Sequence, residues 1–259
     1  MNLTINKLNN RCVLTKEFNS LKVVPEDTEE NKKKYGIPYL PIISKEPIII
    51  KSKDLDVDTK KYIALTFDNS ITKNTDMLLD ILNKNHVRAT FFVYGNTIMD
   101  NVDLIRRVIS CGNELGIHGY SKTKFTLKTI DEIKDDIDIT LSIFNNISIY
   151  PTHIVRPPFN KLNETIKENI GIPLVLSNID TTNSKIQTKE EIIDSILKNV
   201  TSGSIIEMSL SKISLEALED VLPMLIEDGY KIVSVSEMNR RYSNEFMPGM
   251  VYAKIKSDK

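Results

Sequence analysis

Seven side chains that can exchange protons, bind metals or form charged contacts each follow or end a short apolar run. They are Asp68, Asn69, His118, Arg156, Asp180, Glu207 and Ser209. A carboxylate can act as a general base, a histidine can bind a metal or move a proton, and an arginine can hold a carboxylate in place. If the apolar runs are parallel strands, their carboxyl ends meet at one rim, and the set predicts a binding or catalytic cleft. The alternative is structural: Asp68 and Arg156 form an ion pair at the rim and nothing more.

The apolar runs alternate with amphipathic segments along the chain. Strands are predicted at 62–67, 88–94, 114–118, 153–156, 173–177, 203–208 and 231–235. Helices are predicted at 71–87, 101–110, 129–145, 162–169, 188–199 and 215–227. This alternation indicates an α/β fold with about seven parallel strands, closed into a distorted, incomplete (β/α) barrel. A doubly wound open sheet is the alternative, although no Gly-x-Gly-x-x-Gly follows the first strand.

The pattern divides the chain into three parts. Residues 1–60 contain a charged run at 24–34 and a short apolar stretch at 47–50 that suits an edge strand, and we expect an N-terminal extension. Residues 61–242 carry the regular alternation and form the main domain. Residues 243–259 are expected to be a C-terminal tail.

Composition excludes several classes of protein. The chain has 259 residues with a formal net charge of -1, so bulk charge gives no support to nucleic-acid binding. Its two cysteines, Cys12 and Cys111, cannot build a disulfide framework or a cysteine zinc cluster. No stretch approaches the roughly 20 apolar residues of a membrane span, and the first residues do not read as a secretory signal.

Five ordered segments carry a resemblance to a known family. They are 66–70 (Thr-Phe-Asp-Asn-Ser), 116–122 (Gly-Ile-His-Gly-Tyr-Ser-Lys), 156–159 (Arg-Pro-Pro-Phe), 180–183 (Asp-Thr-Thr-Asn) and 203–209 (Gly-Ser-Ile-Ile-Glu-Met-Ser). Over residues 61–242 the chain resembles the polysaccharide deacetylase (NodB-homology) family of carbohydrate esterases. The resemblance implies hydrolysis of N-acetyl C–N bonds in cell-wall glycans, zinc or another divalent metal as cofactor, and a place outside the cytoplasm or in the cell wall.

The resemblance also implies roles for individual residues. Asp68 matches the general base, Arg156 the residue that holds the base, and Asp180 the residue that orients a catalytic histidine. His118 matches the first of two histidines that bind the metal together with an aspartate. In the family, this metal polarises the acetyl oxygen and activates a water molecule.

Several positions depart from the family pattern. Asn69 replaces the metal-binding aspartate, Lys122 replaces the second histidine, and Ser209 stands where the acid histidine belongs. His118 is then the only retained ligand position, and one ligand cannot hold a catalytic zinc, which needs about three. We therefore expect no metal and no other cofactor. We further expect the Lys122 ammonium to replace the metal as a counter-charge in a network with Asp68, Arg156 and Asp180.

Two functions follow from these departures. In the first, the protein hydrolyses an amide without metal: Asp68 is the base, and Glu207, in a pocket that is apolar in the family, is the acid. In the second, the protein is a non-catalytic glycan-binding module or a component of cell-wall or spore assembly. Either way, the expected partner is a glycan such as peptidoglycan or a chitin-like oligosaccharide. The expected substrate-binding residues are Asn69, Tyr120, Lys122, Phe159 and Ser209.

Overall fold

The computed structural model of this chain describes residues 4–8, 11–15, 61–147, 149, 151, 153–182, 186 and 188–256. The charged run at 24–34 and the strand expected at 47–50 lie outside the described residues. The chain forms two compact units, Met1–Asp58 and Thr59–Lys259. In the first unit, β1 (Thr4–Leu8) pairs with β2 (Arg11–Thr15) in antiparallel register. The second unit carries all the predicted site residues.

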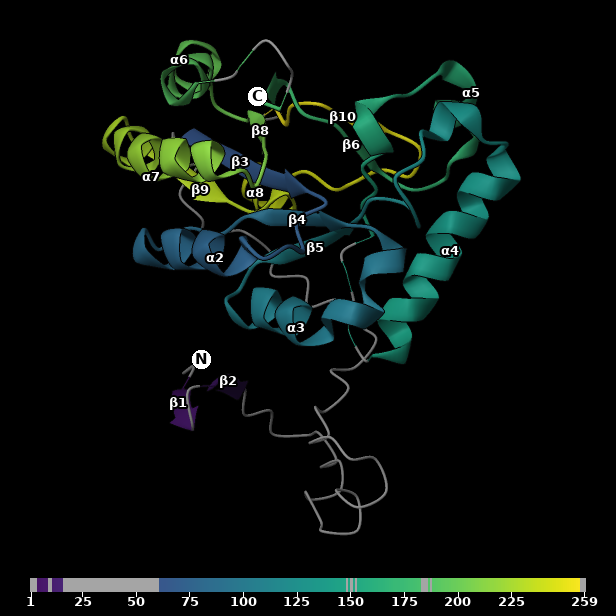
Figure 1. Cartoon of the computed structure of the whole chain (residues 1–259), viewed down its shortest axis with the longest axis horizontal. Coiled ribbons are helices and arrows are strands. Elements are labelled where there is room, and N and C mark those ends of the chain that lie inside the picture. The colour runs from purple at the N-terminus through teal and green to yellow at the C-terminus, as the bar shows by residue number, and fades with distance from the viewer. Residues whose placement is uncertain are drawn as a thin grey trace. The chain divides into compact units, whose positions relative to one another are not determined.

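A parallel sheet forms the centre of the second unit (Figure 1). Its hydrogen-bonded order is β5-β4-β3-β8-β7, and β9 pairs with the first half of β3. The strands are β3 (Lys61–Asp68), β4 (Thr90–Val93), β5 (Glu114–Ile117), β7 (Ile179–Asp180), β8 (Ile205–Met208) and β9 (Tyr230–Val233). All pairs in this sheet are parallel, which confirms the predicted α/β class.

The parallel alignment continues beyond β5 through isolated contacts. Val155 forms parallel bridges to Ile117 on one side and to Leu174 on the other. Leu174 belongs to β6 (Leu174–Val175), which pairs in parallel with β10 (Val251–Tyr252). The strand predicted at 153–156 is thus reduced to one bridging residue, Val155, because Pro157 and Pro158 lack the N–H groups that a longer ladder needs. The result is a curled sheet that suits the incomplete barrel.

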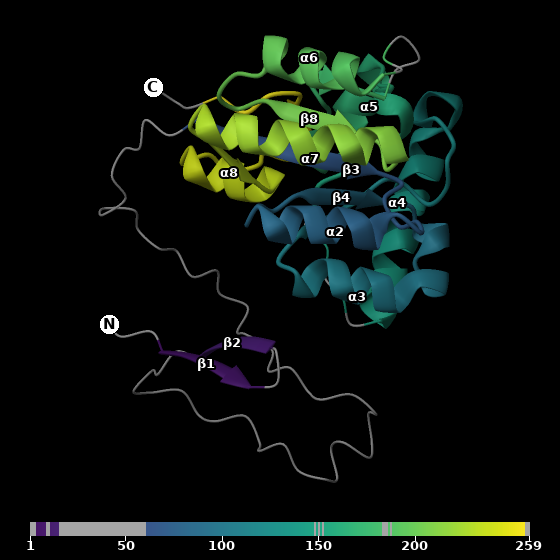
Figure 2. The ribbon, with the colours of Figure 1, turned by 60° about the vertical axis from the view of Figure 1, so that its left-hand side comes forward.

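Helices cover the outer face of this sheet (Figure 2). They are α2 (Thr75–Lys84), α3 (Val102–Ser110), α4 (Ile130–Asn146), α5 (Glu164–Asn169), α6 (Lys189–Asn199) and α7 (Lys212–Glu227). The last helix, α8 (Val235–Arg241), instead packs against the inner side of β3, in one cluster with Tyr62 and Ala64. Thr129 caps α4 through a capping box with Glu132. The sequence did not indicate α8, which has only two turns.

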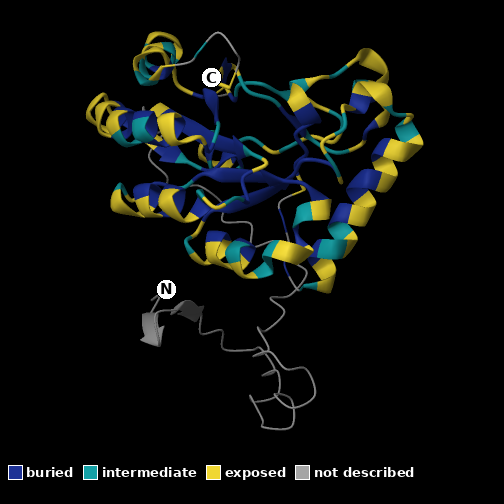
Figure 3. Cartoon of the chain, in the orientation of Figure 1, coloured by how far each residue is buried: buried dark blue, intermediate teal, exposed yellow. Residues whose placement is uncertain are grey.

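Strand β3 separates the packed core from the functional side of the sheet. Ile63, Leu65 and Phe67 lie on its outer face and pack in one cluster with side chains from α2 and α7. Because alternate residues of a strand point to opposite faces, Thr66 and Asp68 point to the inner side of the curled sheet. The strands of the sheet are buried throughout most of their length (Figure 3). β3 therefore holds the site against a rigid core.

The segment after Tyr242 differs from the tail that the sequence suggests. It supplies β10, and the N–H group of Ile255 donates a 3.0 Å hydrogen bond to the carbonyl oxygen of Gly203. Ile255 is itself buried. A two-residue strand carries no periodicity, which is why the sequence pattern does not reveal it. No helix in the described part of the chain has the length and apolar character needed to cross a bilayer.

Candidate functional site

Four of the predicted side chains converge at the carboxyl ends of the strands. Asp68 ends β3, His118 follows β5, Arg156 follows the Val155 bridge, and Glu207 lies in β8. Parallel pairing places Glu207 opposite Thr66 on β3, two residues before Asp68. The convergence expected from the strand order is therefore seen for Asp68, His118, Arg156 and Glu207.

Arg156 is the fixed positive charge of the site. Its side chain is fully buried, and its Nη1 atom donates to Thr66 Oγ1 at 2.7 Å and to Asp68 Oδ1 at 2.9 Å. Nε donates to the Val175 carbonyl at 3.3 Å, and the guanidinium carbon lies 4.3 Å from the ring centroid of Phe92. A planar fork with this many partners has little freedom to move. Arg156 therefore holds one Asp68 oxygen in a set position.

Two carboxyl groups face this arginine from neighbouring strands. Arg156 Nη1 lies 3.9 Å from Glu207 Oε2, which also accepts a 3.0 Å hydrogen bond from Ser177 Oγ and one from the Asn160 amide. Burial, reinforced by the charge of Asp68, raises the pKa of Glu207 to about 7. Burial also raises the pKa of Asp68, against the lowering effect of Arg156. The two acids thus form a pair that holds protons more readily than exposed carboxyls do.

His118 is a neutral imidazole beside this pair. Its Nδ1 atom lies 2.8 Å from the carbonyl oxygen of Arg156, which can only accept, so Nδ1 carries the hydrogen. Its Nε2 atom lies 3.4 Å from Asp68 Oδ2, and its ring lies 4.5 Å, centroid to centroid, from that of Tyr94. Burial lowers the pKa of His118 to about 4. At neutral pH, the lone pair of Nε2 faces Asp68.

The donor set at this site does not fit a catalytic zinc. Among the described residues, no three His, Cys, Asp or Glu side chains are grouped so that they could hold a metal ion. Asn69, at the metal-binding aspartate position, offers only a neutral amide oxygen, and it adopts a positive φ of 47°. Lys122 offers an ammonium group without a lone pair. His118 remains as the one strong nitrogen donor, and zinc needs about three protein ligands.

Lys122 does not take the place expected of it in a charge network. Its ammonium lies over the ring of Phe159, 5.9 Å from the centroid, and it forms no ion pair with Asp68. The expectation that it is the counter-charge of Asp68 is therefore wrong: the buried Arg156 already neutralises Asp68. Lys122 is exposed, and solvation favours an exposed ammonium over a buried one.

Asp180 and Ser209 lie at the predicted strand ends but make local contacts. Asp180 Oδ1 accepts hydrogen bonds of 2.7 Å from the N–H and the hydroxyl of Thr182. Its charge contributes to the raised pKa values of Asp68 and Glu207. Ser209 Oγ donates at 3.1 Å to Ser211, the residue that caps α7. The roles assigned to Asp180 and Ser209 remain predictions, as do those of Asn69, Tyr120 and Phe159.

Sequence reasoning missed three polar residues that complete the site. Thr66 and Ser177 donate or accept hydrogen bonds within it, and Asn160 bonds to both Ser177 and Glu207. Phe159 and Asn160 have positive φ angles of 62° and 54°, a conformation that is uncommon outside glycine. The signal was their position, since Asn160 directly follows the 156–159 motif and Ser177 ends a predicted strand.

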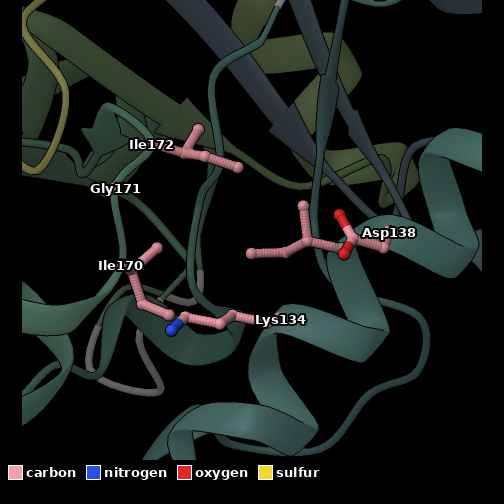
Figure 4. Close-up of a pocket in the computed structure, with 6 residues that line it drawn as sticks. Lys134, Asp138, Ile170, Gly171 and Ile172 are labelled. Carbon is pink, nitrogen blue, oxygen red and sulfur yellow. The ribbon is translucent and has the colours of Figure 1, made fainter.

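A separate hollow lies away from these residues, between α4 and the loop that leads to β6 (Figure 4). Its volume is about 270 Å³, and Lys134, Ile137, Asp138, Ile170, Gly171 and Ile172 line it. None of these is a predicted site residue.

Comparison with known proteins gives the family of this chain. A profile of the polysaccharide deacetylase family matches residues 56–172. The peptidoglycan-N-acetylmuramic acid deacetylase PdaA of Bacillus subtilis is 30% identical over 188 residues, covering 69% of this chain and 72% of that protein. The chain therefore belongs to the polysaccharide deacetylase family.

Other relatives extend this comparison. The peptidoglycan-N-acetylglucosamine deacetylase PgdA of Listeria monocytogenes is 30% identical over 217 residues, covering 83% of this chain but only 45% of its own length. The solved structure of T48 deacetylase with substrate superposes with a TM-score of 0.70 at 29% identity, covering 76% of this chain and 99% of that one. A CE4 family pseudoenzyme from Bacillus anthracis has the same fold, with a TM-score of 0.64 at 23% identity, covering 70% of this chain and 66% of that one.

Proposed function

We propose that this chain is a glycan-binding member of its family that has lost metal-dependent deacetylation. The observation that carries the proposal is the donor set: one histidine remains, beside an asparagine and a lysine that points to Phe159. The family's Lewis acid has no adequate site here, and Ser209 replaces its proton donor. The site keeps the arginine and the carboxylates, and exposed aromatic rings in the same motifs can hold a sugar.

The ligand that we propose is a cell-wall glycan containing N-acetylated sugars. PdaA and PgdA are named for acting on N-acetylmuramic acid and N-acetylglucosamine in peptidoglycan. Two exposed aromatic side chains, Tyr120 and Phe159, can provide apolar faces for sugar rings, and Phe159 directly precedes Asn160, which bonds Glu207. A chain with such a ligand would work where it meets the cell wall.

Metal-free hydrolysis is the second candidate, and the acid pair supports it. Asp68 would accept a proton from water as the hydroxide attacks the acetyl carbon, and Glu207 would donate a proton to the leaving nitrogen. The products are acetate and a free amine, and water restores the two groups. A pKa of about 7 suits Glu207 to this task, since a general acid works best when its pKa lies near the working pH.

One experiment separates the two candidates. The full chain is titrated calorimetrically with chitohexaose and with peptide-free peptidoglycan strands, and acetate release is measured with EDTA and with added zinc or cobalt. Binding without acetate release supports the binding module. Acetate release in EDTA that is lost in both Asp68→Asn and Glu207→Gln supports hydrolysis by the acid pair. Zinc-dependent release by the unmodified chain, or no binding of either glycan, would overturn the proposal.

A further inference from the structure

Two lysine ammonium groups flank one exposed aromatic ring at the edge of the site. Lys122 Nζ lies 5.9 Å and Lys124 Nζ lies 5.6 Å from the ring centroid of Phe159. The Phe159 side chain is 45% exposed, and both lysines are exposed. We name Lys122, Lys124 and Phe159 the cationic platform. It presents an apolar ring and two positive charges to solvent together.

The two lysines have no carboxylate partner in the part of the chain that the structure describes. Their neighbour Lys128 differs, because it pairs with Asp136 on α4. The attraction between an exposed ammonium and an aromatic ring is weak, and it leaves the ammonium charge free to meet an anion. Among the residues that the structure describes, no carboxylate neutralises the positive charge of the platform.

The backbone at Phe159 has an unfavourable conformation, and it holds the aromatic ring at the surface. Phe159 and Asn160 are consecutive residues with positive φ, a backbone conformation that is strained for a bulky side chain such as Phe159. Phe159 gains little burial in return. Its neighbour Asn160 turns inward and bonds Ser177 and Glu207. One short turn thus ties the exposed ring to the buried acid pair, so a ligand on the platform lies next to the site.

We propose that the cationic platform is a subsite for a sugar that bears a carboxylate. The apolar face of the pyranose stacks on Phe159, and its carboxylate binds the ammonium groups of Lys122 and Lys124. A neutral sugar could only stack on the Phe159 ring, whereas an anion without a sugar could only bind the two ammonium groups. This inference rests on the proposed glycan-binding function and specifies the class of glycan.

The test compares glycans that differ in charge. The full chain is titrated with chitohexaose, which is neutral, with a peptide-free strand of alternating N-acetylglucosamine and N-acetylmuramic acid, and with a hyaluronan hexasaccharide. The second carries lactyl carboxylates and the third carries uronic carboxylates. Two exposed ion pairs predict roughly 3- to 10-fold tighter binding of the anionic glycans in 50 mM salt, with the advantage falling in 500 mM salt. Preference for one anionic glycan over the other identifies the source of the carboxylate.

Variants assign the effect to the platform. The double substitution Lys122→Gln, Lys124→Gln should remove the advantage of the anionic glycans, so that the variant binds them no more tightly than it binds chitohexaose. Phe159→Ala should weaken all three glycans. Lys134→Gln, an exposed lysine on α4 at the separate hollow, is the matched control and should change nothing.

The outcomes distinguish this inference from the proposed function. Equal binding of neutral and anionic glycans, or an anionic advantage that survives the double substitution, overturns the subsite and leaves the glycan-binding function standing. If inorganic phosphate at millimolar concentration displaces the anionic glycans but the Phe159→Ala variant binds them normally, the site takes anions without recognising sugars, and the inference fails. If no glycan binds, both the inference and the proposed function fail.

Discussion

Two buried residues at the site, Glu207 and His118, titrate in opposite senses. Burial raises the pKa of Glu207 to about 7, so its contribution to stability is complete below pH 4.5 and is lost as pH rises to 7. Burial lowers the pKa of His118 to about 4, so its contribution is complete above pH 6.5 and is lost as pH falls to 4. The two effects oppose each other between pH 4.5 and 6.5.

Removing the Glu207 titration should therefore expose the effect of His118. In Glu207→Gln, the free energy of unfolding should rise more steeply with pH. Its difference from the unmodified chain should shift in favour of the variant by up to about 3 kcal/mol between pH 4.5 and 7.5. Urea unfolding at several pH values measures this difference. Glu219→Gln, on an exposed pair with Lys84, is the control. A difference that stays constant with pH would show that Glu207 titrates normally.

Restoring the missing donors should restore metal binding. The double substitution Asn69→Asp, Lys122→His supplies two donors beside His118. Loss of a residue that only supports a metal ligand lowers metal affinity about 10- to 100-fold, so two added ligands should tighten zinc binding by at least that factor. Competition with a chromophoric chelator measures the zinc affinity. The control is Ser209→His alone, because position 209 matches the family's acid histidine and not one of its metal ligands. An unmodified chain that binds zinc as tightly as the double variant contradicts our account of the donor set.

The sequence identified the residue types at the site but not all of their contacts. Asp68, His118, Arg156 and Glu207 were predictable because strand ends in a parallel sheet converge, whatever the side chains do. The contact of the Lys122 ammonium with Phe159 was not predictable. A lysine side chain has several rotatable bonds, and the fold decides which partners lie within its reach. Asn160 was missed because its contact with Glu207 depends on a positive φ angle, which the sequence pattern does not indicate.

At the scale of elements, long segments were predictable and short ones were not. The strand at 62–67 and the helix at 129–145 carry enough residues for a period, and both appear as β3 and α4 with small changes in length. Strands β7 and β10 have two residues each, so they depend on partners that are distant in sequence. Tertiary pairing creates such strands, and no local pattern encodes them.

Gly203 is the position at which the distant C-terminal segment meets β8. A Cβ atom there would lie 1.7 Å from the carbonyl oxygen of Ile255, and the φ angle is +84°. Gly203→Ala should therefore combine backbone strain with a clash and lower the free energy of unfolding by more than about 2 kcal/mol. Two other glycines are matched controls. Gly229→Ala, with the same φ and open space, should cost about 1 kcal/mol, and Gly171→Ala should cost close to nothing.

Urea denaturation of the three alanine variants gives the order directly. The expected order of stability is Gly171→Ala above Gly229→Ala above Gly203→Ala. Equal losses for Gly203→Ala and Gly229→Ala would mean that strain alone matters and that the contact with Ile255 does not hold the segment in place.

At the scale of the whole molecule, the second unit contains a complete core. Its central strand β3 is bounded by partners on both sides, and its helices cover the outer face. Contributions from the C-terminal segment complete the inner side, where Ile255 packs with residues of β3 and α8. The chain divides into this unit and a separate compact unit that ends at Asp58.

Two truncations should therefore have opposite outcomes. A chain that starts at Thr59 keeps every element of the sheet, and its unfolding midpoint in urea should match that of the full chain. A chain that stops after Tyr242 loses β10 and the buried Ile255, and burial of one such side chain is worth about 1.5–3 kcal/mol before the lost hydrogen bonds are counted. Its midpoint should fall clearly. If the chain that stops after Tyr242 keeps its midpoint, residues 243–259 are the tail that the sequence suggests. If the chain that starts at Thr59 has a lower midpoint, residues 1–58 stabilise the second unit.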